Sequence, residues 1–454
     1  IAGALEETYR SRNAGKKHVP ADRIDRVMTH RIWGLPIFLL LMWITFQATF
    51  SLGGIPAEWM EAGVQWLGDW VTGLMPEGSL RELLVGGIIS GVGGVIVFLP
   101  NILILFFFIS LMEDTGYMAR AAFIMDKLMH KIGLHGKSFI PLLMGFGCNV
   151  PAIMASRTIE SRSSRLITIL ITPFMSCSAR IPIYLLLTGT FFAANAGLVM
   201  LGLYVLGIVL AVVTARLMRR FLFPVDETPF VMELPPYRLP TWKTTLSHMW
   251  DKCAQYLKKM GGMILIASVI VWFLSYYPRT DETAGTETHY ANSYLGRLGK
   301  GCEPVFSPLG FNWKASVALL SGLPAKEIVV STLGVLYSEG AATAPAEEEA
   351  VIGGADGATE IIVKTDDPTP AEAFRTAEEE EADSLSQRLL ASGDFTTASA
   401  LAFLVFILLY MPCIATVAAI GAEAGWKWAA ASVVYNTTLA WFVAWIVYRI
   451  ALIF

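Results

Sequence analysis

The sequence predicts an all-α protein that crosses a membrane several times. Only 16% of its 454 residues are charged and 54% are hydrophobic, whereas roughly 25% of residues are charged in soluble domains. Several apolar runs reach the roughly 20 residues that a bilayer crossing needs. Pro and Gly interrupt some of these runs, and broken backbone is tolerated in lipid only where protein or a wet cavity surrounds it. We therefore expect about nine to eleven membrane segments, some of them discontinuous.

The charge balance and the cysteines exclude several other classes of protein. The net charge of −4 combines two regions of opposite charge. The segment 338–396 has fifteen acidic and three basic residues, and the rest of the chain is basic. The chain has five cysteines; their odd number and the lack of a CxxC pair argue against a disulfide framework or a zinc knuckle. No GxxxxGK[ST] loop is present, so we expect no nucleotide phosphate cradle in this chain. We expect membrane lipid as a partner and no nucleic acid.

The chain divides into successive segments. Residues 1–32 are basic and amphipathic, which predicts a cytoplasmic lead-in at the membrane surface. Residues 33–80 then predict a first span at 33–50, followed by an interfacial helix at 55–75. The remaining segments are a first unit at 81–222, a cytoplasmic loop at 223–259, a span and extramembrane loop at 260–312, and a second unit at 313–454 that contains an acidic insertion at 338–396.

The two units show a faint internal repeat. In the first, a Gly-rich segment ends near Pro100, which we expect to break the apolar run, and a helix broken by glycines follows and carries Cys148. In the second, Pro324 precedes a broken segment that carries Cys413, with the acidic insertion between them. We expect this insertion to be poorly ordered. Transporters built from inverted repeats place their site at such interrupted helices.

The first candidate site residue is Cys148, in the motif Gly-Phe-Gly-Cys-Asn-Val-Pro. Met144 lies four residues earlier, on the same face if the helix continues. Thiolate and thioether are soft ligands that suit Cu(I), Zn and iron. Asn149 and Pro151 interrupt the helix and leave backbone carbonyls open as further ligands. The alternative is a small buried cysteine that fills a packing gap.

Two further cysteines lie in similar surroundings. Cys177 lies between Ser176 and Ser178, and Cys413 follows a proline. Their thiols, the hydroxyls and the freed carbonyls could line one cavity. In the alternative interpretation, the hydroxyls bond back to their own helix.

Carboxylates supply the remaining candidates. Glu113 and Asp114 end an apolar run, and two adjacent carboxylates repel unless a cation neutralises them. A divalent metal could be that cation. Alternatively, the two carboxylates face water at the membrane edge or pair with an arginine. Lys326 and Glu327 lie in an apolar frame and either pair with each other or serve a pore. No histidine lies in a confident span, which disfavours a His-built zinc or haem site.

Taken together, these motifs resemble the membrane domain of the FeoB-type ferrous iron transporters of bacteria. The matching stretches cover nearly the whole chain. They are Asp22–Arg31, Leu111–Arg120, Gly145–Pro151, Pro173–Arg180, Ala325–Val330 and Leu409–Cys413.

The resemblance implies two gate-type units of inverted topology that form a pore through the bacterial inner membrane, with the N-terminus in the cytoplasm. It implies that Cys148, Cys177 and Cys413 relay Fe(II) as the transported substrate. Members of the family carry an N-terminal GTP-binding domain, so GTP and Mg would act through a domain absent here, of which residues 1–20 would be the tail. The expected partners are small cytoplasmic accessory proteins of iron uptake, and a homo-oligomer is compatible with the resemblance. The chain itself would be no enzyme.

Three rival functions stay open at this stage. The same architecture could transport another divalent metal or a nucleoside-like solute. A membrane enzyme could use Cys148 as a nucleophile, although such a site needs a base and no histidine lies in a confident span. A non-transporting sensor or scaffold could recruit partners through the acidic insertion.

Overall fold

The computed structural model describes residues 28, 30, 33–76, 78–97, 99–223, 241–278, 286–337 and 384–453. Every regular element among them is helical, and six of the helices are long and apolar enough to cross a membrane. The predicted all-α polytopic fold is therefore confirmed. The predicted lead-in at 1–32, apart from residues 28 and 30, and most of the acidic insertion lie outside the described residues.

The first helices depart from the predicted boundaries. α3 runs without interruption from Gly34 to Leu74, so the expected division into a span and a separate interfacial helix is wrong. Its 41 residues measure about 62 Å at 1.5 Å per residue, roughly twice the thickness of the hydrocarbon core. Pro56 is accommodated inside α3, which packs along α6.

The Gly-rich segment and the helix after it form one candidate span, Ser79–Asp114. Pro100 is the second described residue of α6, and residue 98 before it lies outside the described residues. The break expected at Pro100 therefore stays a prediction. The elements of this span are α4 (Ser79–Glu82), a π-helical turn (Leu83–Ile89), α5 (Ser90–Val97) and α6 (Leu99–Asp114).

The first unit continues with an amphipathic helix, a hairpin of two short helices, a broken helix and a long closing helix. The glycine interruption predicted within 138–156 and the proline interruption predicted near Pro173 are both confirmed. The elements are α7 (Tyr117–Ile132), α8 (Phe139–Met144), α9 (Asn149–Ala155), α10 (Arg162–Ile171), α11 (Ile181–Phe191) and α12 (Ala196–Phe221).

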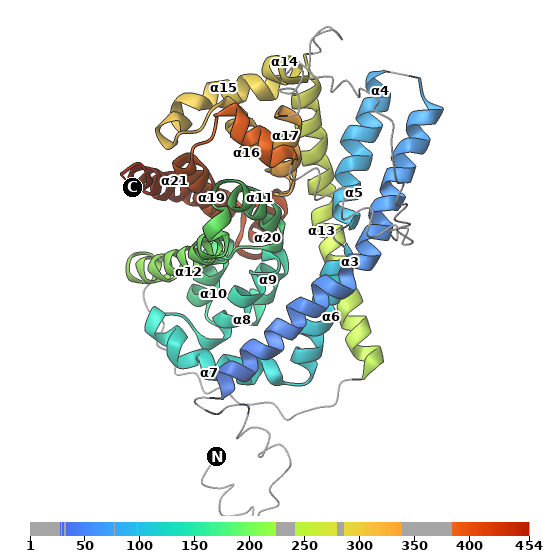
Figure 1. Cartoon of the computed structure of the whole chain (residues 1–454). Coiled ribbons are helices and arrows are strands. Elements are labelled where there is room, and N and C mark those ends of the chain that lie inside the picture. Colours follow the sequence, from blue (N-terminus) through green and yellow to red (C-terminus); the bar gives the residue numbers. More distant parts are fainter. Residues whose placement is uncertain are drawn as a thin grey trace, which may run out of the picture.

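The second unit repeats this order of elements. A long helix leads to a short helix and an amphipathic one, and a hairpin, a broken helix and a closing helix follow (Figure 1). The elements are α13 (Trp242–Tyr276), α14 (Thr286–Asn292), α15 (Tyr294–Phe306), α16 (Trp313–Ser321), α17 (Ile328–Leu336), α19 (Thr397–Leu409), α20 (Ile414–Ala424) and α21 (Trp426–Ala451).

Polar contacts identify the open ends of the two hairpins. At the first, Lys137 before α8 bonds Glu160 after α9 at 2.8 Å. At the second, the amide of Asn312 before α16 donates to the hydroxyl of Tyr337 after α17 at 3.5 Å. The hairpins lie in opposite halves of the molecule, α8–α9 in the lower half of Figure 1 and α16–α17 in the upper half. Each unit is thus the inverted counterpart of the other.

Two predicted loops prove to be helical. α13 begins at Trp242, so much of the predicted loop at 223–259 belongs to a helix, because Trp242 stacks on Phe107 and Cys253 is buried. The last part of the acidic insertion, residues 384–392, is also helical. Leu385 and Leu389, one turn apart, bury their side chains in the main core, so this part of the insertion is ordered, contrary to the prediction.

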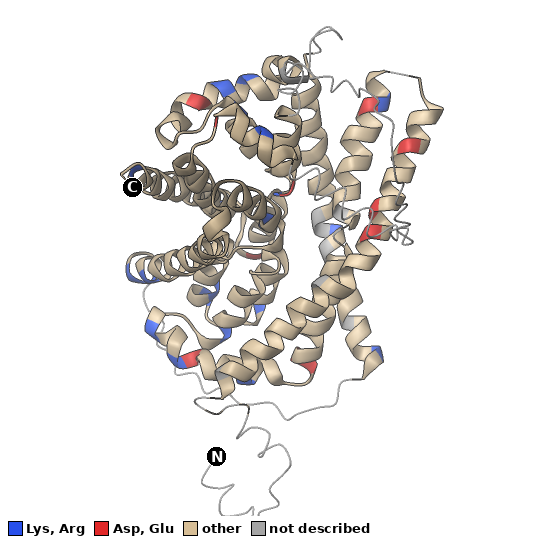
Figure 2. Cartoon of the chain, in the orientation of Figure 1, with Lys and Arg blue, Asp and Glu red and all other residues tan. Residues whose placement is uncertain are grey.

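The core centres on α19, whose side chains are almost all buried, while α12 and α21 are covered on one side only. Figure 2 shows most of the basic residues of the first unit at its lower end. The basic residues of this unit include Arg157 in the turn after α9, Arg162 and Arg165 at the start of α10, and Arg219 and Arg220 in the last turn of α12. A concentration of Lys and Arg in short connections is typical of a cytoplasmic face.

Candidate functional site

All three predicted path cysteines occupy the same kind of position, the residue just before a helical segment. Cys148 precedes α9, Cys177 precedes a 3-10 turn that leads into α11, and Cys413 precedes α20. Each lies in extended backbone, with ψ angles of 130°, 161° and 153°. The first N–H groups of a helix carry a partial positive charge that favours an anion, and this suits a thiol that loses its proton to bind a metal.

The tip of the first hairpin contacts the break of the first broken helix. The backbone N–H and the hydroxyl of Ser178 both donate to the Gly147 carbonyl, at 3.2 and 3.0 Å. With its amide nitrogen turned toward them, Asn149 donates to the carbonyls of Gly145 and Thr172 at 3.2 Å each. The tip therefore satisfies backbone groups that the broken helix leaves free.

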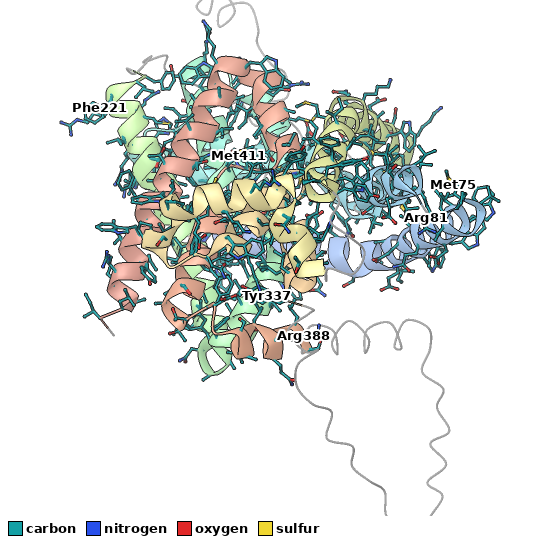
Figure 3. All side chains as sticks on the ribbon, turned by 90° about the horizontal axis from the view of Figure 1, so that it is seen from above. Met75, Arg81, Phe221, Tyr337, Arg388 and Met411 are labelled. Atoms are coloured by element: carbon teal, nitrogen blue, oxygen red, sulfur yellow. The ribbon has the colours of Figure 1, made fainter. Side chains whose placement is uncertain are left out.

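The second hairpin repeats this contact at the second break. The N–H of Ile414 donates to the Leu323 carbonyl at 3.0 Å, as Ser178 donates to Gly147 in the first unit. Lys326 donates its ammonium to the Met411 carbonyl at 2.8 Å. Its nitrogen lies 3.3 Å from the centre of the Tyr410 ring, a cation–π contact. Met411 lies toward the middle of the molecule when the chain is seen from above (Figure 3).

The three thiols lie in the region where these contacts are made. Cys148 lies within electrostatic reach of Cys177, and both lie within reach of Cys413 and Glu327. Each thiol is half-buried, and the sulfur of Cys413 lies 3.1 Å from the hydroxyl of Thr416. Among the described residues, no three His, Cys, Asp or Glu side chains are close enough together to hold a metal ion.

The other predicted residues of the breaks support the backbone. Arg180 is buried and donates to the carbonyls of Pro173 and Met175 at 3.3–3.4 Å. The hydroxyl of Ser176 donates to that of Tyr184 at 3.2 Å. Pro151 lies in the first turn of α9, where a missing N–H costs little.

Three predicted ligands lie elsewhere. Met144 packs in a different hydrophobic cluster from Cys148, against Phe38, because the helix ends at Met144 and does not continue through Cys148. Glu113 is exposed at the end of α6, and Asp114 accepts a hydrogen bond from Thr245 on α13 at 3.0 Å. Glu113 follows Leu105, which lies beside Gly147, by two helical turns or about 12 Å, so these carboxylates do not join the thiols.

The sequence analysis missed a contact that joins the two units. Arg157, just after α9, forms a two-pronged ion pair with Glu423 in the last turn of α20; its Nε lies 2.7 Å from Oε2. The two residues are 266 positions apart, so no local pattern points to their pairing. The internal repeat does not point to it either, because α9 belongs to a hairpin and α20 to a broken helix.

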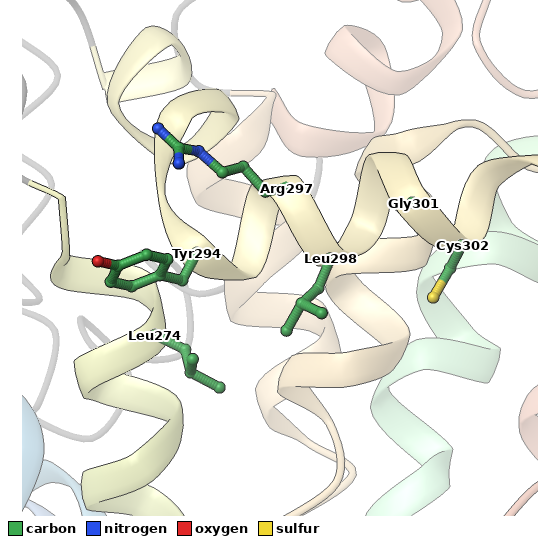
Figure 4. A pocket seen from close by; sticks show the side chains of 6 residues that line it. All are labelled: Leu274, Tyr294, Arg297, Leu298, Gly301 and Cys302. Carbon is green, nitrogen blue, oxygen red and sulfur yellow. The ribbon is translucent and has the colours of Figure 1, made fainter.

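A separate hollow of about 570 Å³ lies between α13 and α15. Figure 4 shows Leu274, Leu298 and Cys302 along it, with the Arg297 side chain extending away from them. None of the predicted site residues lines it. This hollow is therefore distinct from the region of the three thiols.

The chain has two inverted units, and in each unit a re-entrant hairpin meets a broken helix at mid-molecule. This architecture defines a membrane protein of the transporter class. Comparison with known families is consistent with this. The Gate family, described as nucleoside recognition, matches residues 95–191 and 257–427. The C-terminal family of ferrous iron transport protein B matches residues 200–252. The chain belongs to the Gate family, and it is a membrane region of the FeoB type.

Curated relatives agree with this membership. The chain is 53% identical over its whole length to an Fe(2+) transport protein A/Fe(2+) transporter FeoB fusion protein of Porphyromonas gingivalis. It is 42% identical, over 94% of its length, to the Fe(2+) transporter FeoB of Campylobacter jejuni. It covers 54% and 65% of these two proteins, so it spans between half and two thirds of the relatives it matches. No solved structure matches the chain.

Proposed function

We propose that this chain forms the path by which Fe(II) crosses the bacterial inner membrane. The observation that carries the proposal is the convergence of Cys148, Cys177 and Cys413 at two helix breaks and a hairpin tip. Thiolates are soft ligands that accept first-row transition metals. The names of the relatives, which are Fe(2+) transporters, favour iron over other metals of this class.

The residues take distinct roles in this proposal. The three thiols offer successive weak contacts, because a transported ion has to leave each site as readily as it enters. Glu327 supplies the negative charge beside them. Asn149, Pro151, Ser176 and Ser178 hold the backbone of the first tip and break. The chain itself carries out transport and no covalent reaction.

The proposal extends to orientation and to partners. The basic residues near Arg157 and Arg219 favour a cytoplasmic location for the lower face of Figure 2 by the positive-inside rule, and with it a cytoplasmic N-terminus. GTP and Mg would act from a domain outside this chain by biasing the two units. The fused relative, whose name includes transport protein A, supports a small accessory protein as a partner. A homo-oligomer is compatible with the exposed apolar surfaces of α12 and α21.

Anaerobic uptake of radioactive Fe(II) by liposomes that contain the chain tests the proposal. We expect uptake by the wild type and its loss in the double variant Cys148→Ser/Cys413→Ser. The matched control is Cys302→Ser, since Cys302 lies in the hollow beside α15 and should leave uptake unchanged. Full uptake by the folded double variant would rule out the thiol path.

The alternative is a transporter of a nucleoside-like solute, favoured by the description of the Gate family as nucleoside recognition. It predicts that nucleosides compete with the transported substrate and that Mn(II) and Zn(II) do not. Competition by the metals alone would exclude it.

A further inference from the structure

We propose that Lys326 is a tethered cation that closes the path in the second unit and is displaced when Fe(II) arrives. This inference rests on the proposed function, because it assumes that a divalent metal approaches the thiols. It assigns to one side chain the step that couples ion entry to opening of a hairpin.

The first support is a difference between two equivalent positions. At each hairpin tip, one polar side chain donates to a carbonyl at the break of the neighbouring broken helix. In the first unit this is the neutral amide of Asn149 on Thr172. In the second unit it is the ammonium of Lys326 on Met411. Beside each of these bonds lies a similar backbone hydrogen bond, from Ser178 to Gly147 in the first unit and from Ile414 to Leu323 in the second. We call the side-chain bond and the backbone bond at one tip together a clasp. The two clasps therefore differ mainly in the charge of the side-chain donor.

The second support is the position of that charge. Lys326 is 2% exposed, and a buried charge needs close compensation. The Tyr410 ring and the Met411 carbonyl provide it directly. Arg180, Cys413, Cys177 and Glu327 all lie within electrostatic reach of the same ammonium, so a second buried cation already repels it while the other three groups attract it. The groups proposed to attract Fe(II) therefore already attract an internal cation.

A divalent ion at these groups competes with the ammonium. Two cations near one set of anionic ligands repel each other, and the repulsion is stronger away from bulk water. Movement of Lys326 frees the Met411 carbonyl, which is an oxygen ligand that the ion can use. It also removes the side-chain half of the clasp and leaves the Ile414–Leu323 hydrogen bond to open alone. In the first unit the donor at the tip is the neutral Asn149. Among the described residues, the buried cation Arg180 bonds carbonyls of its own break and none of the tip, so we expect this clasp to stay closed.

Hydrogen exchange at single backbone amides tests this asymmetry. The Ile414 N–H reports the second clasp directly, and the Ser178 N–H reports the first. In the wild-type chain in lipid, we expect saturating anaerobic Fe(II) to accelerate exchange at Ile414 at least fivefold. Exchange at Ser178 should stay within twofold, and Mg(II) should have no effect at either amide.

Two variants separate the charge from the hydrogen bond. Lys326→Gln keeps a donor for the Met411 carbonyl but carries no charge, like Asn149, so Ile414 should exchange slowly with and without Fe(II). Lys326→Arg keeps the charge and should keep a response to Fe(II). Size-exclusion profiles identify variants that fail to fold. A wild-type chain whose Ile414 ignores Fe(II), or a Lys326→Gln variant that responds as the wild type does, would overturn the inference.

Uptake measured on the same preparations distinguishes the two proposals. If the wild type transports Fe(II) but exchange at Ile414 does not change, only the role of Lys326 is wrong. If the wild type transports no Fe(II), the proposed function fails and this inference fails with it.

Discussion

Arg157 and Glu423 join the ends of two short helices from different units. α9 begins just after Cys148 and ends near Arg157, while α20 begins just after Cys413 and ends near Glu423. The two helices pack against each other. Cys148 and Cys413 thus lie at one end of this helix pair and the ion pair at the other. In the proposed path, the ion pair lies on the side that we assign to the cytoplasm.

We expect Arg157→Ala to destabilise the chain. The Glu423 side chain is 9% exposed and that of Arg157 is 47% exposed, so the substitution removes a two-pronged partner from a largely buried carboxylate, while the pair itself is partly screened. We expect the free energy of unfolding to fall by about 1–2 kcal/mol, as for the loss of a half-buried, charge-assisted pair. Thermal unfolding in detergent measures it.

The control is Lys137→Ala, which removes the ion pair with Glu160. Glu160 is 66% exposed, so we expect a smaller loss of stability than for Arg157→Ala, because water screens an exposed pair. Equal effects of the two substitutions would contradict the role given to Arg157.

Gly145→Ala should disturb the first hairpin tip. A Cβ at Gly145 would lie 2.9 Å from the Met175 Cβ and 3.1 Å from a backbone oxygen, so the tip would have to move away from the break. We expect about 1–3 kcal/mol of destabilisation, typical of overpacking, and slower Fe(II) uptake. Gly202→Ala in α12, where no atom lies within 4 Å, should be neutral or stabilising because alanine favours helix.

The two sets of carboxylates should differ in transport. Glu327 lies within electrostatic reach of the thiols, whereas Glu113 lies at the far end of α6. We expect Glu327→Gln to lower the initial rate of Fe(II) uptake about tenfold or more, as for loss of a charged group in a pore. Glu113→Gln should retain at least half of the wild-type rate. If Glu113→Gln lowered the uptake rate more than Glu327→Gln did, Glu113 at the end of α6 would be the residue that attracts the ion.

Acid should loosen the connection between α7 and α8 through His135. Its Nδ1 accepts the backbone N–H of Lys137 at 3.1 Å, and partial burial is the main cause that lowers the pKa of His135 below its usual 6.5, against the opposing charge of Asp126. A lowered pKa means that the neutral ring stabilises the fold above pH 6.5, and that this contribution is lost as pH falls through the folded-state pKa. Protonation also removes the acceptor.

Unfolding midpoints measured from pH 7.5 to pH 5 test this expectation. The wild type should lose stability below pH 6.5, and His135→Gln should show a flatter profile across that interval. An identical slope in the two proteins would show that His135 does not contribute to the pH dependence.

The sequence was sufficient to predict the individual interruptions. Gly145, Gly147 and Pro173 break apolar runs that would otherwise be uniform helices, and each break appears where the pattern predicts it. These signals are local, because a missing side chain or a missing N–H acts within one turn of the chain. Local signals also misled: residues 55–75 were expected to form a separate interfacial helix, but α3 runs through them without interruption.

The sequence by itself determined a polytopic helical chain with three cysteines at helix interruptions. Only the tertiary structure decided which polar groups join them. Glu113 and Asp114 had the strongest local pattern, but they lie about two helical turns beyond Leu105, the residue of α6 beside the first hairpin tip. Met144 does not share a helical face with Cys148, because the helix ends between them. Lys326 reaches Met411 across 85 positions within the second unit, and the Arg157–Glu423 pair joins the two units across 266 positions. Local propensity fixes where a helix breaks, whereas the meeting of two breaks depends on how the units pack.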